Sequence, residues 1–179
     1  MKKLLYILSV SLLLIGCMDL SNTPTKKAEI FLKKYQTLDS DVLTDLDNVL
    51  DENMDMNVEQ KDKYRSIMKK HYQNLTYEIK DETINGDDAI VEVEISVTDF
   101  RKVLDEAGSY LNNNQEEFHD EFGNYDISKY TDYRLDRLKE AREKVKYTIE
   151  LSLTKVNDEW QVNELNDVTL DKINGVFNY

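Results

Sequence analysis

The sequence predicts an α+β fold in which N-terminal helices pack on a curved, cone-like sheet of four antiparallel strands, with a helical insertion between two hairpins. Three observations support this prediction. Apolar residues recur at helical spacing through residues 24–74. They alternate with polar residues in four short stretches between residues 75 and 162. Helical spacing returns over about residues 99–143, between the second and third of these stretches.

Three helices are expected before the sheet, over residues 24–38, 41–50 and 58–74. Pro24 suits the first position of the first helix, because the amide hydrogen that proline lacks is unused there. Asn57 and Gln60 resemble a reciprocal capping pair at the start of the third helix. The apolar stripes of the three helices are Ala28, Phe31, Leu32, Tyr35 and Leu38; Leu43, Leu46 and Leu50; and Tyr64, Ile67, Met68, His71 and Tyr72.

Two hairpins supply the four strands. The first is expected to turn at Asn85-Gly86, because this dipeptide favours the backbone of tight hairpin turns. The second is expected to turn at Asn157-Asp158. The predicted inward positions of the strands are all apolar or aromatic: Leu75, Tyr77, Ile79, Val91, Val93, Ile95, Val97, Tyr147, Ile149, Leu151, Leu153, Trp160 and Val162.

The insertion at about residues 99–143 is expected to hold two helical segments separated by Gly123-Asn124. The first begins at Phe100, and the pattern leaves open whether it runs on through Phe118 and Phe122. Ser128 is a candidate cap for the second segment. After the last strand, apolar residues at helical spacing predict a short closing helix: Leu170, Ile173, Val176 and Phe177.

The first 23 residues are interpreted as a leader and a tether. Residues 1–16 have the form of a secretory signal peptide, because a basic start precedes a 13-residue apolar run that is shorter than the roughly 20 residues of a transmembrane helix. Residues 14–17, Leu-Ile-Gly-Cys, resemble the lipobox of bacterial lipoproteins. This resemblance implies cleavage before Cys17 and attachment of diacylglycerol to its thiol, with palmitate-type acyl chains. An ordinary cleaved signal peptide is the alternative.

Residues 17–23 would form a short tether, and residues 24–179 a single domain held at the outer face of the cell membrane by the lipid on Cys17. The net charge is −13, and loss of Lys2 and Lys3 with the leader takes it to −15. That sign excludes nucleic acid as a partner. A single cysteine excludes an intramolecular disulfide, and five glycines leave little room for a phosphate-binding loop, so no cofactor is expected.

The order of elements is similar to that of the nuclear-transport-factor-2-like, or cystatin-like, α+β cone. Residues 24–35, 74–97 and 146–162 resemble the small lipoproteins of low-GC Gram-positive bacteria that carry such a domain with uncharacterised function. The resemblance implies a cone-shaped fold with a pocket between helices and sheet. It selects no activity, because that fold hosts enzymes, ligand binders and interaction modules.

Neither catalysis nor metal binding is expected. The inward strand positions contain no carboxylate or histidine, and the inward Tyr77 and Tyr147 are more simply core residues. His71, on the stripe of the third helix, is the best titrating candidate, with a core or rim histidine as the alternative. Glu-x-x-His at residues 116–119 lacks the second such unit that a carboxylate di-metal site needs.

Two non-catalytic functions remain. The first is a protein-interaction module that contacts another envelope or secreted protein through the aromatic residues of the insertion: Tyr110, Phe118, Phe122, Tyr125, Tyr130 and Tyr133. The alternative for these residues is that they fasten the helices to the cone. The second function is binding of an unknown small molecule in a pocket formed by Tyr35, His71, Tyr72, Tyr77, Tyr147 and Trp160. The outer sheet face is too charged for sheet-to-sheet dimerisation, so a monomer is expected.

Overall fold

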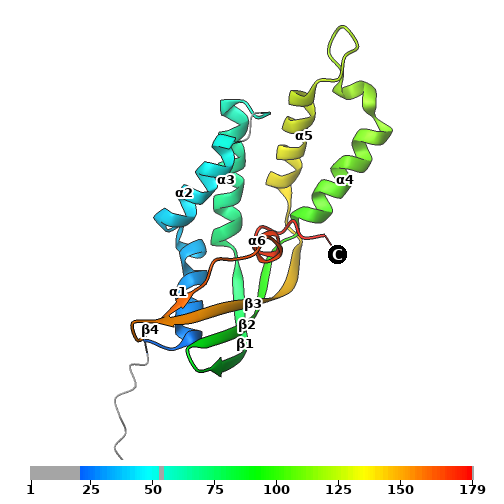
Figure 1. Ribbon diagram of the computed structural model, residues 1–179. Helices are drawn as coiled ribbons and strands as arrows, with labels where there is room; N and C mark the ends of the chain where they lie inside the picture. The colour runs from blue at the N-terminus through cyan, green and yellow to red at the C-terminus, as the bar shows by residue number, and fades with distance from the viewer. Residues whose placement is uncertain (1–20, 53–54, 179) are drawn as a thin grey trace, which may run out of the picture.

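The computed structural model describes residues 21–52 and 55–178 (Figure 1). The predicted signal peptide and Cys17 therefore lie outside the described residues. In chain order the elements are α1 (Pro24–Thr37), α2 (Ser40–Glu52), α3 (Val58–Gln73), β1 (Thr76–Asn85), β2 (Asp88–Thr98), α4 (Phe100–Asn113), η1 (Gln115–Phe118), α5 (Ile127–Glu140), β3 (Lys144–Val156), β4 (Glu159–Val162) and α6 (Asp167–Ile173). In the described part of the chain, no helix combines the length and apolarity needed to cross a membrane.

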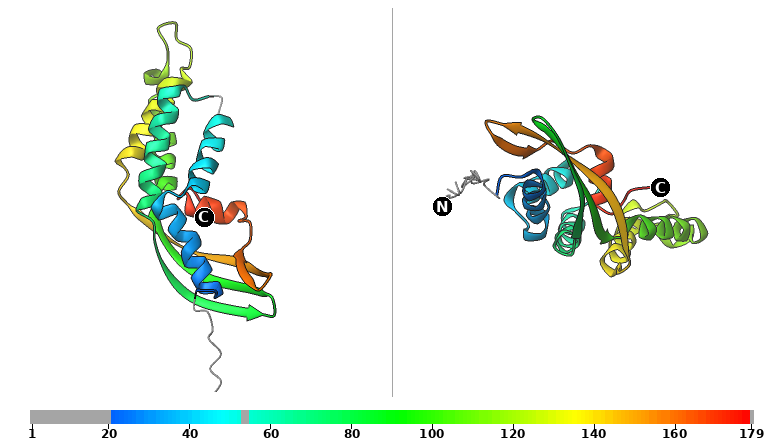
Figure 2. Two further views of the ribbon diagram at one scale, coloured as in Figure 1. Left: turned by 90° about the vertical axis from the view of Figure 1, so that its left-hand side faces the viewer. Right: turned by 90° about the horizontal axis from the view of Figure 1, so that it is seen from below.

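The four strands form one antiparallel sheet in the order β1-β2-β3-β4, which confirms the predicted α+β fold class. The sheet is curved and open rather than closed into a barrel (Figure 2). In register, Ile95 of β2 lies between Tyr77 of β1 and Tyr147 of β3. The predicted inward residues of β2 are all fully buried, because successive side chains of a strand point to opposite faces and only one face meets the helices.

Helices α1 and α3 lie against the inner face of the sheet, and α2 packs on these two helices and completes the core (Figures 1 and 2). Pro24 opens α1 as predicted, with Thr23 as the capping residue. The capping box of Asn57 and Gln60 is present at the start of α3. On α2 the buried residues include Val42, whereas the predicted Leu43 is only half-buried.

Helices α4 and α5 form a hairpin that projects away from the sheet, with α5 beside α3 and the connecting loop at the far end (Figures 1 and 2). The hairpin also belongs to the core. Phe100 at its start, and Leu135 and Leu138 on α5, are buried among residues of the sheet and of α1–α3.

Two local predictions, the position of the first turn and the cap of α5, are corrected, and the end of α4, which the sequence left open, is determined. The first hairpin turns at Gly86-Asp87, one residue later than predicted, because Asn85 still pairs with Asp88 and Gly86 has φ +64°. Helix α4 ends at Asn113, so it does not run on through Phe118 and Phe122. The cap of α5 is Asp126, whose carboxylate accepts the backbone N–H groups of residues 128 and 129, and not Ser128.

Candidate functional site

The tyrosines of the predicted pocket pack against neighbouring side chains. Tyr35 meets Tyr72 edge to face at 5.2 Å between ring centroids. The hydroxyl of Tyr72 donates to Asn174 Oδ1 at 2.9 Å, and burial raises the pKa of Tyr35 to about 12. Tyr147 is buried against Phe177. The two remaining aromatic residues lie on the sheet: Tyr77, half-buried on β1, and Trp160, buried on β4.

The aromatic residues of the insertion divide into two groups. Four of them form a cluster that fastens α4, η1 and α5 together: Tyr110, Phe118, Tyr130 and Tyr133. Phe118 is buried at its centre and meets the other three rings at 5.3–6.3 Å, while Tyr110 and Tyr133 stack at 4.9 Å. The cluster therefore has a structural role within the insertion; it joins the elements of the insertion to one another and not, as the alternative interpretation had it, to the cone.

The other two of these aromatic residues, Phe122 and Tyr125, are exposed in the loop that joins η1 to α5, and Ile127 is exposed at the first position of α5. Phe122 is 80% exposed, Tyr125 49% and Ile127 50%. The loop is ordered by Asp120, whose carboxylate accepts the backbone N–H groups of Phe122 and Asn124 at 2.9 and 2.8 Å. These bonds lower the pKa of Asp120. We call Phe122, Tyr125 and Ile127 the hairpin tip.

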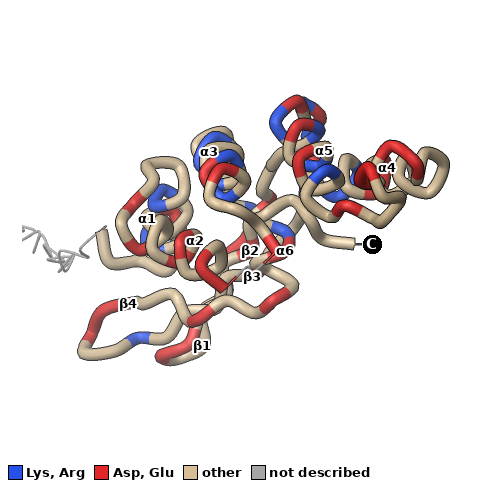
Figure 3. The backbone as a smooth tube through the Cα atoms, turned by 90° about the horizontal axis from the view of Figure 1, so that it is seen from above, with Lys and Arg blue, Asp and Glu red and all other residues tan. Residues whose placement is uncertain are grey.

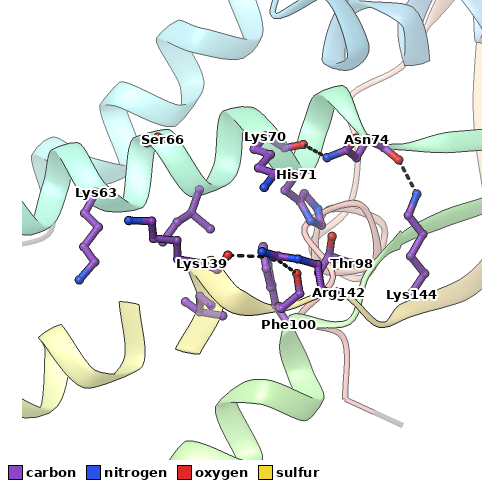
Figure 4. A pocket seen from close by; sticks show the side chains of 13 residues that line it. Lys63, Ser66, Lys70, His71, Asn74, Thr98, Phe100, Lys139, Arg142 and Lys144 are labelled. Carbon is purple, nitrogen blue, oxygen red and sulfur yellow. Dashed lines mark hydrogen bonds between the residues drawn. The ribbon is translucent and has the colours of Figure 1, made fainter. Parts of the chain in front are cut away.

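A cleft of about 420 Å³ lies between α3 and α5, near the start of β3 (Figure 4). Its residues come from three separate segments of the chain: Lys63, Ser66, Ile67, Lys70, His71 and Asn74; Thr98 and Phe100; and Leu138, Lys139, Ala141, Arg142 and Lys144. Gln60 of α3 links this helix to α5. Its side-chain amide donates to Ser128 O, Ser128 Oγ and Asp132 Oδ1 at 2.9–3.1 Å.

The cleft is basic although the protein is strongly acidic. No Asp or Glu occurs among its described lining residues. Lys63 pairs with Asp136 at 2.6 Å. The other cations, Lys70, Lys139, Arg142 and Lys144, make no salt bridge within residues 21–52 and 55–178, and we call these four residues the cleft cations. Seen from above, Lys and Arg gather on α3 and α5 (Figure 3).

His71 contributes to the cleft from α3 and is buried to 2% exposure. Its ring stacks on Phe100 at 4.6 Å. Nε2 lies 2.8 Å from Ile173 O, and because a carbonyl only accepts, Nε2 carries the hydrogen. Nδ1 is then an acceptor, and it has no hydrogen-bond partner among the described residues. Burial lowers the pKa of His71 to about 4, with Lys144 adding to the effect, so the imidazole is neutral near pH 7.

Gly175, in the segment after α6, lies next to the His71 ring and the end of β2. It has φ +71°, and a Cβ built on it would lie 2.1 Å from Thr98 O and 3.0 Å from His71 Cε1. Its carbonyl accepts the backbone N–H of Arg101 at 2.8 Å. A glycine is therefore needed for this segment to approach the end of β2 closely enough to cover His71.

The described residues contain no group of three His, Cys, Asp or Glu side chains arranged to hold a metal ion. Glu116 lies on η1, whereas His119 and Asp120 follow it in the loop, so the helical face that would unite them does not form. Asp120 instead orders the hairpin tip.

Of the candidate site residues named from the sequence, His71 alone lines this cleft, and no pattern in the sequence pointed to the cleft cations. Lys70 is one of several lysines on α3, and Lys139 and Arg142 are about 70 residues away in the chain. The one local indication of a basic site is the presence of four cations within residues 137–144. The spacing of these residues is equally compatible with an ordinary solvent-exposed surface.

No protein-family model matches this chain, and no curated protein matches its sequence. Among solved structures, a match is found to the crystal structure of YcdA from Bacillus subtilis, a protein provisionally classed as a lipoprotein. The sequence identity is 15% and the TM-score is 0.44. The match covers 85% of this chain and 47% of that chain, so this chain spans about half of that protein. A match at this level assigns neither a family nor a function.

Proposed function

We propose that this chain is an envelope lipoprotein that acts without catalysis, as a protein-interaction module at the outer face of the cell membrane. The lipobox-like residues 14–17 support the anchor on Cys17. The order of helices and strands agrees with the nuclear-transport-factor-2-like cone, which we take as the family context. The observation that carries the proposal is the hairpin tip, where an aromatic pair and an isoleucine are exposed on an ordered loop.

The position of the tip supports this function. The start of the described chain is fastened to the β3–β4 turn, because Asn22 bonds to Asp158 O and to the backbone N–H of Trp160. The tip lies at the opposite end of the molecule (Figure 1). A lipid anchor on Cys17 would therefore leave the tip facing away from the membrane. The outer sheet face carries ion pairs such as Lys146–Glu94, which agrees with a monomer.

The test is crosslinked capture on intact cells with three forms of the full chain. Removal of the whole insertion is unsuitable, because Phe100, Leu135 and Leu138 belong to the core. The double variant Phe122→Ser/Tyr125→Ser alters the tip alone. Its control is Val49→Ser/Val58→Ser, which changes residues that are 62% and 78% exposed elsewhere.

We expect a protein that the wild type and the control capture and that the tip variant loses. Capture of the same proteins by all three forms would contradict the proposal, and so would the absence of any specific capture. Circular dichroism spectra and unfolding midpoints of the three forms show that each is folded, so that a loss reports on the tip.

A further inference from the structure

The cleft cations lie together without an acidic side chain among them, in a chain that has 36 acidic residues and 23 basic ones. Ten other cations of the described chain have a carboxylate partner, and so does Lys63 at the edge of the cleft. Grouping like charges is unfavourable unless an anion offsets the repulsion. The cleft is therefore suited to an anion that comes from outside the chain.

Two of the cleft cations are held in position by the backbone. The guanidinium of Arg142 donates to Lys139 O and Ala141 O at 3.0 and 2.7 Å, and Lys144 Nζ donates to Asn74 O at 2.7 Å (Figure 4). Both groups keep further N–H donors, since a guanidinium has five and an ammonium has three. Donors that are already positioned lose less conformational entropy when they bind a ligand.

We propose that the cleft between α3 and α5 is a binding site for an organic phosphate monoester. Four cations exceed what a single carboxylate needs, whereas a phosphate dianion has two charges and three terminal oxygens that can accept from several cationic donors at once. The organic part follows from the apolar residues that line the same cleft, Ile67, Phe100, Leu138 and Ala141. A volume of about 420 Å³ is in the range of small-molecule sites and exceeds what an inorganic phosphate fills.

His71, at the floor of the cleft, indicates a second property of the ligand, which concerns its hydrogen-bonding groups. Nδ1 of His71 is a buried acceptor without a partner among the described residues, and an unsatisfied buried polar atom has a free-energy cost. A hydroxyl or N–H group on the organic part would satisfy it. His71 is neutral near pH 7, so it contributes a hydrogen-bond acceptor to the floor and leaves the charge to the cleft cations.

The two histidines make a direct test possible. His71 is at the cleft floor and His119 is in the hairpin loop, so a chain labelled with ¹⁵N-histidine has one reporter in the site and one outside it. The probe is phenyl phosphate, titrated into the full chain in zwitterionic micelles at constant ionic strength. Phenol and inorganic phosphate are the neutral and the inorganic comparison ligands. We expect saturable shifts of the His71 nitrogens with phenyl phosphate, and weaker binding of both comparison ligands.

Matched variants separate a site from a general attraction of charges. Lys70→Ala/Lys139→Ala removes two exposed cleft cations, and Lys33→Ala/Lys61→Ala removes the same charge from α1 and the far side of α3. We expect the first variant to bind phenyl phosphate about tenfold more weakly and the second to bind as the wild type does. Ser66→Trp keeps every charge but fills the cleft, and it should also abolish the His71 shifts.

The source of the phosphate is distinguished with vesicles of phosphatidylcholine with and without phosphatidic acid, whose headgroup is a phosphate monoester. Shifts of His71 that require phosphatidic acid support a lipid ligand, and shifts with phenyl phosphate alone support a soluble one. Equal weakening by the two lysine variants would overturn the proposal. Inorganic phosphate that binds as tightly as phenyl phosphate would do so too, as would the absence of saturable shifts of His71 with every probe.

Discussion

At the scale of single residues, His71 links the stability of the fold to pH. The imidazole of an unfolded chain titrates near pH 6.5, whereas burial holds the pKa of His71 in the folded chain at about 4. Between these values the unfolded chain binds more protons, so acidification favours unfolding. Between pH 7 and pH 5 this one residue should lower the free energy of unfolding by about 2 kcal/mol.

The measurement is urea unfolding at both pH values for the wild type, His71→Gln and His119→Gln. Other groups also titrate in this range, so the informative quantity is the difference between variants. His71→Gln should lose about 2 kcal/mol of the pH dependence of the wild type, and His119→Gln is the control for removal of a histidine. Identical dependence in all three would show that His71 is not buried in its neutral form.

Gly175 is a second residue on which the site depends. Gly175→Ala should destabilise the protein by roughly 3 kcal/mol, because the new Cβ would meet Thr98 O at 2.1 Å and the backbone has φ +71°. The same change at Gly108, in the middle of α4 with open space around it, should stabilise by about 0.5–1 kcal/mol through helix propensity. Unfolding free energies that move in the same direction for both variants would contradict the close approach at Gly175.

At the scale of elements, Gln60 determines how α5 lies against α3. Its Oε1 accepts the backbone N–H of Asn57 in the capping box, and its Nε2 donates to Ser128 and Asp132. Gln60→Glu keeps the cap but replaces the donor with a buried carboxylate that faces the exposed Asp132. We expect a loss of about 3 kcal/mol in unfolding free energy at pH 7, with faster hydrogen exchange along α5.

Asp132→Asn provides the matched rescue. Combined with Gln60→Glu, it restores a donor and an acceptor in exchanged positions, so the double variant should recover a large part of the loss. Asp132→Asn alone should have a small effect, because Gln60 still donates to Ser128. Strictly additive effects of the two changes would show that the pair is not coupled across the two helices.

The elements themselves could be predicted because their signals are local. Alternating residues identified four strands, and the apolar stripes with the Asn57 and Gln60 cap identified the first three helices. The failure to predict the cap of α5 depends on a contact with a residue far away in the chain. Ser128 is as good a cap by residue type as Asp126, but its oxygens accept from Gln60, 68 residues earlier. The choice between them is therefore made by tertiary structure.

The same reason explains the candidate sites. His71 could be selected from the sequence because it belongs to the stripe of α3. The cleft cations could not, because Lys70 reaches the others only when α5 packs beside α3. Among the aromatic residues of the insertion, composition does not separate the buried Phe118 from the exposed Phe122. That difference arises because α4 ends at Asn113. The chain after it places Phe118 in the buried cluster and Phe122 in the exposed hairpin tip.

At the scale of the whole molecule, the proposed anchor and the proposed contact surface are at opposite ends, and one thiol can test both. Cys17 is the single cysteine of the sequence. If its sulfur is bound to lipid in a thioether, the wild-type chain has no free thiol, even when denatured. Phe122→Cys then places the one reactive thiol at the hairpin tip, and Ala107→Cys places it at a buried position of the same hairpin.

The measurement is labelling with a membrane-impermeant maleimide in a Gram-positive host, on intact cells and after denaturation. We expect no labelling of the wild type in either condition, labelling of Phe122→Cys on intact cells, and labelling of Ala107→Cys only after denaturation. A wild-type chain that labels once denatured would show that Cys17 is not acylated. If Phe122→Cys is labelled only after denaturation and not on intact cells, the tip is not exposed at the cell surface. The proposed interaction surface could then not contact a partner outside the cell.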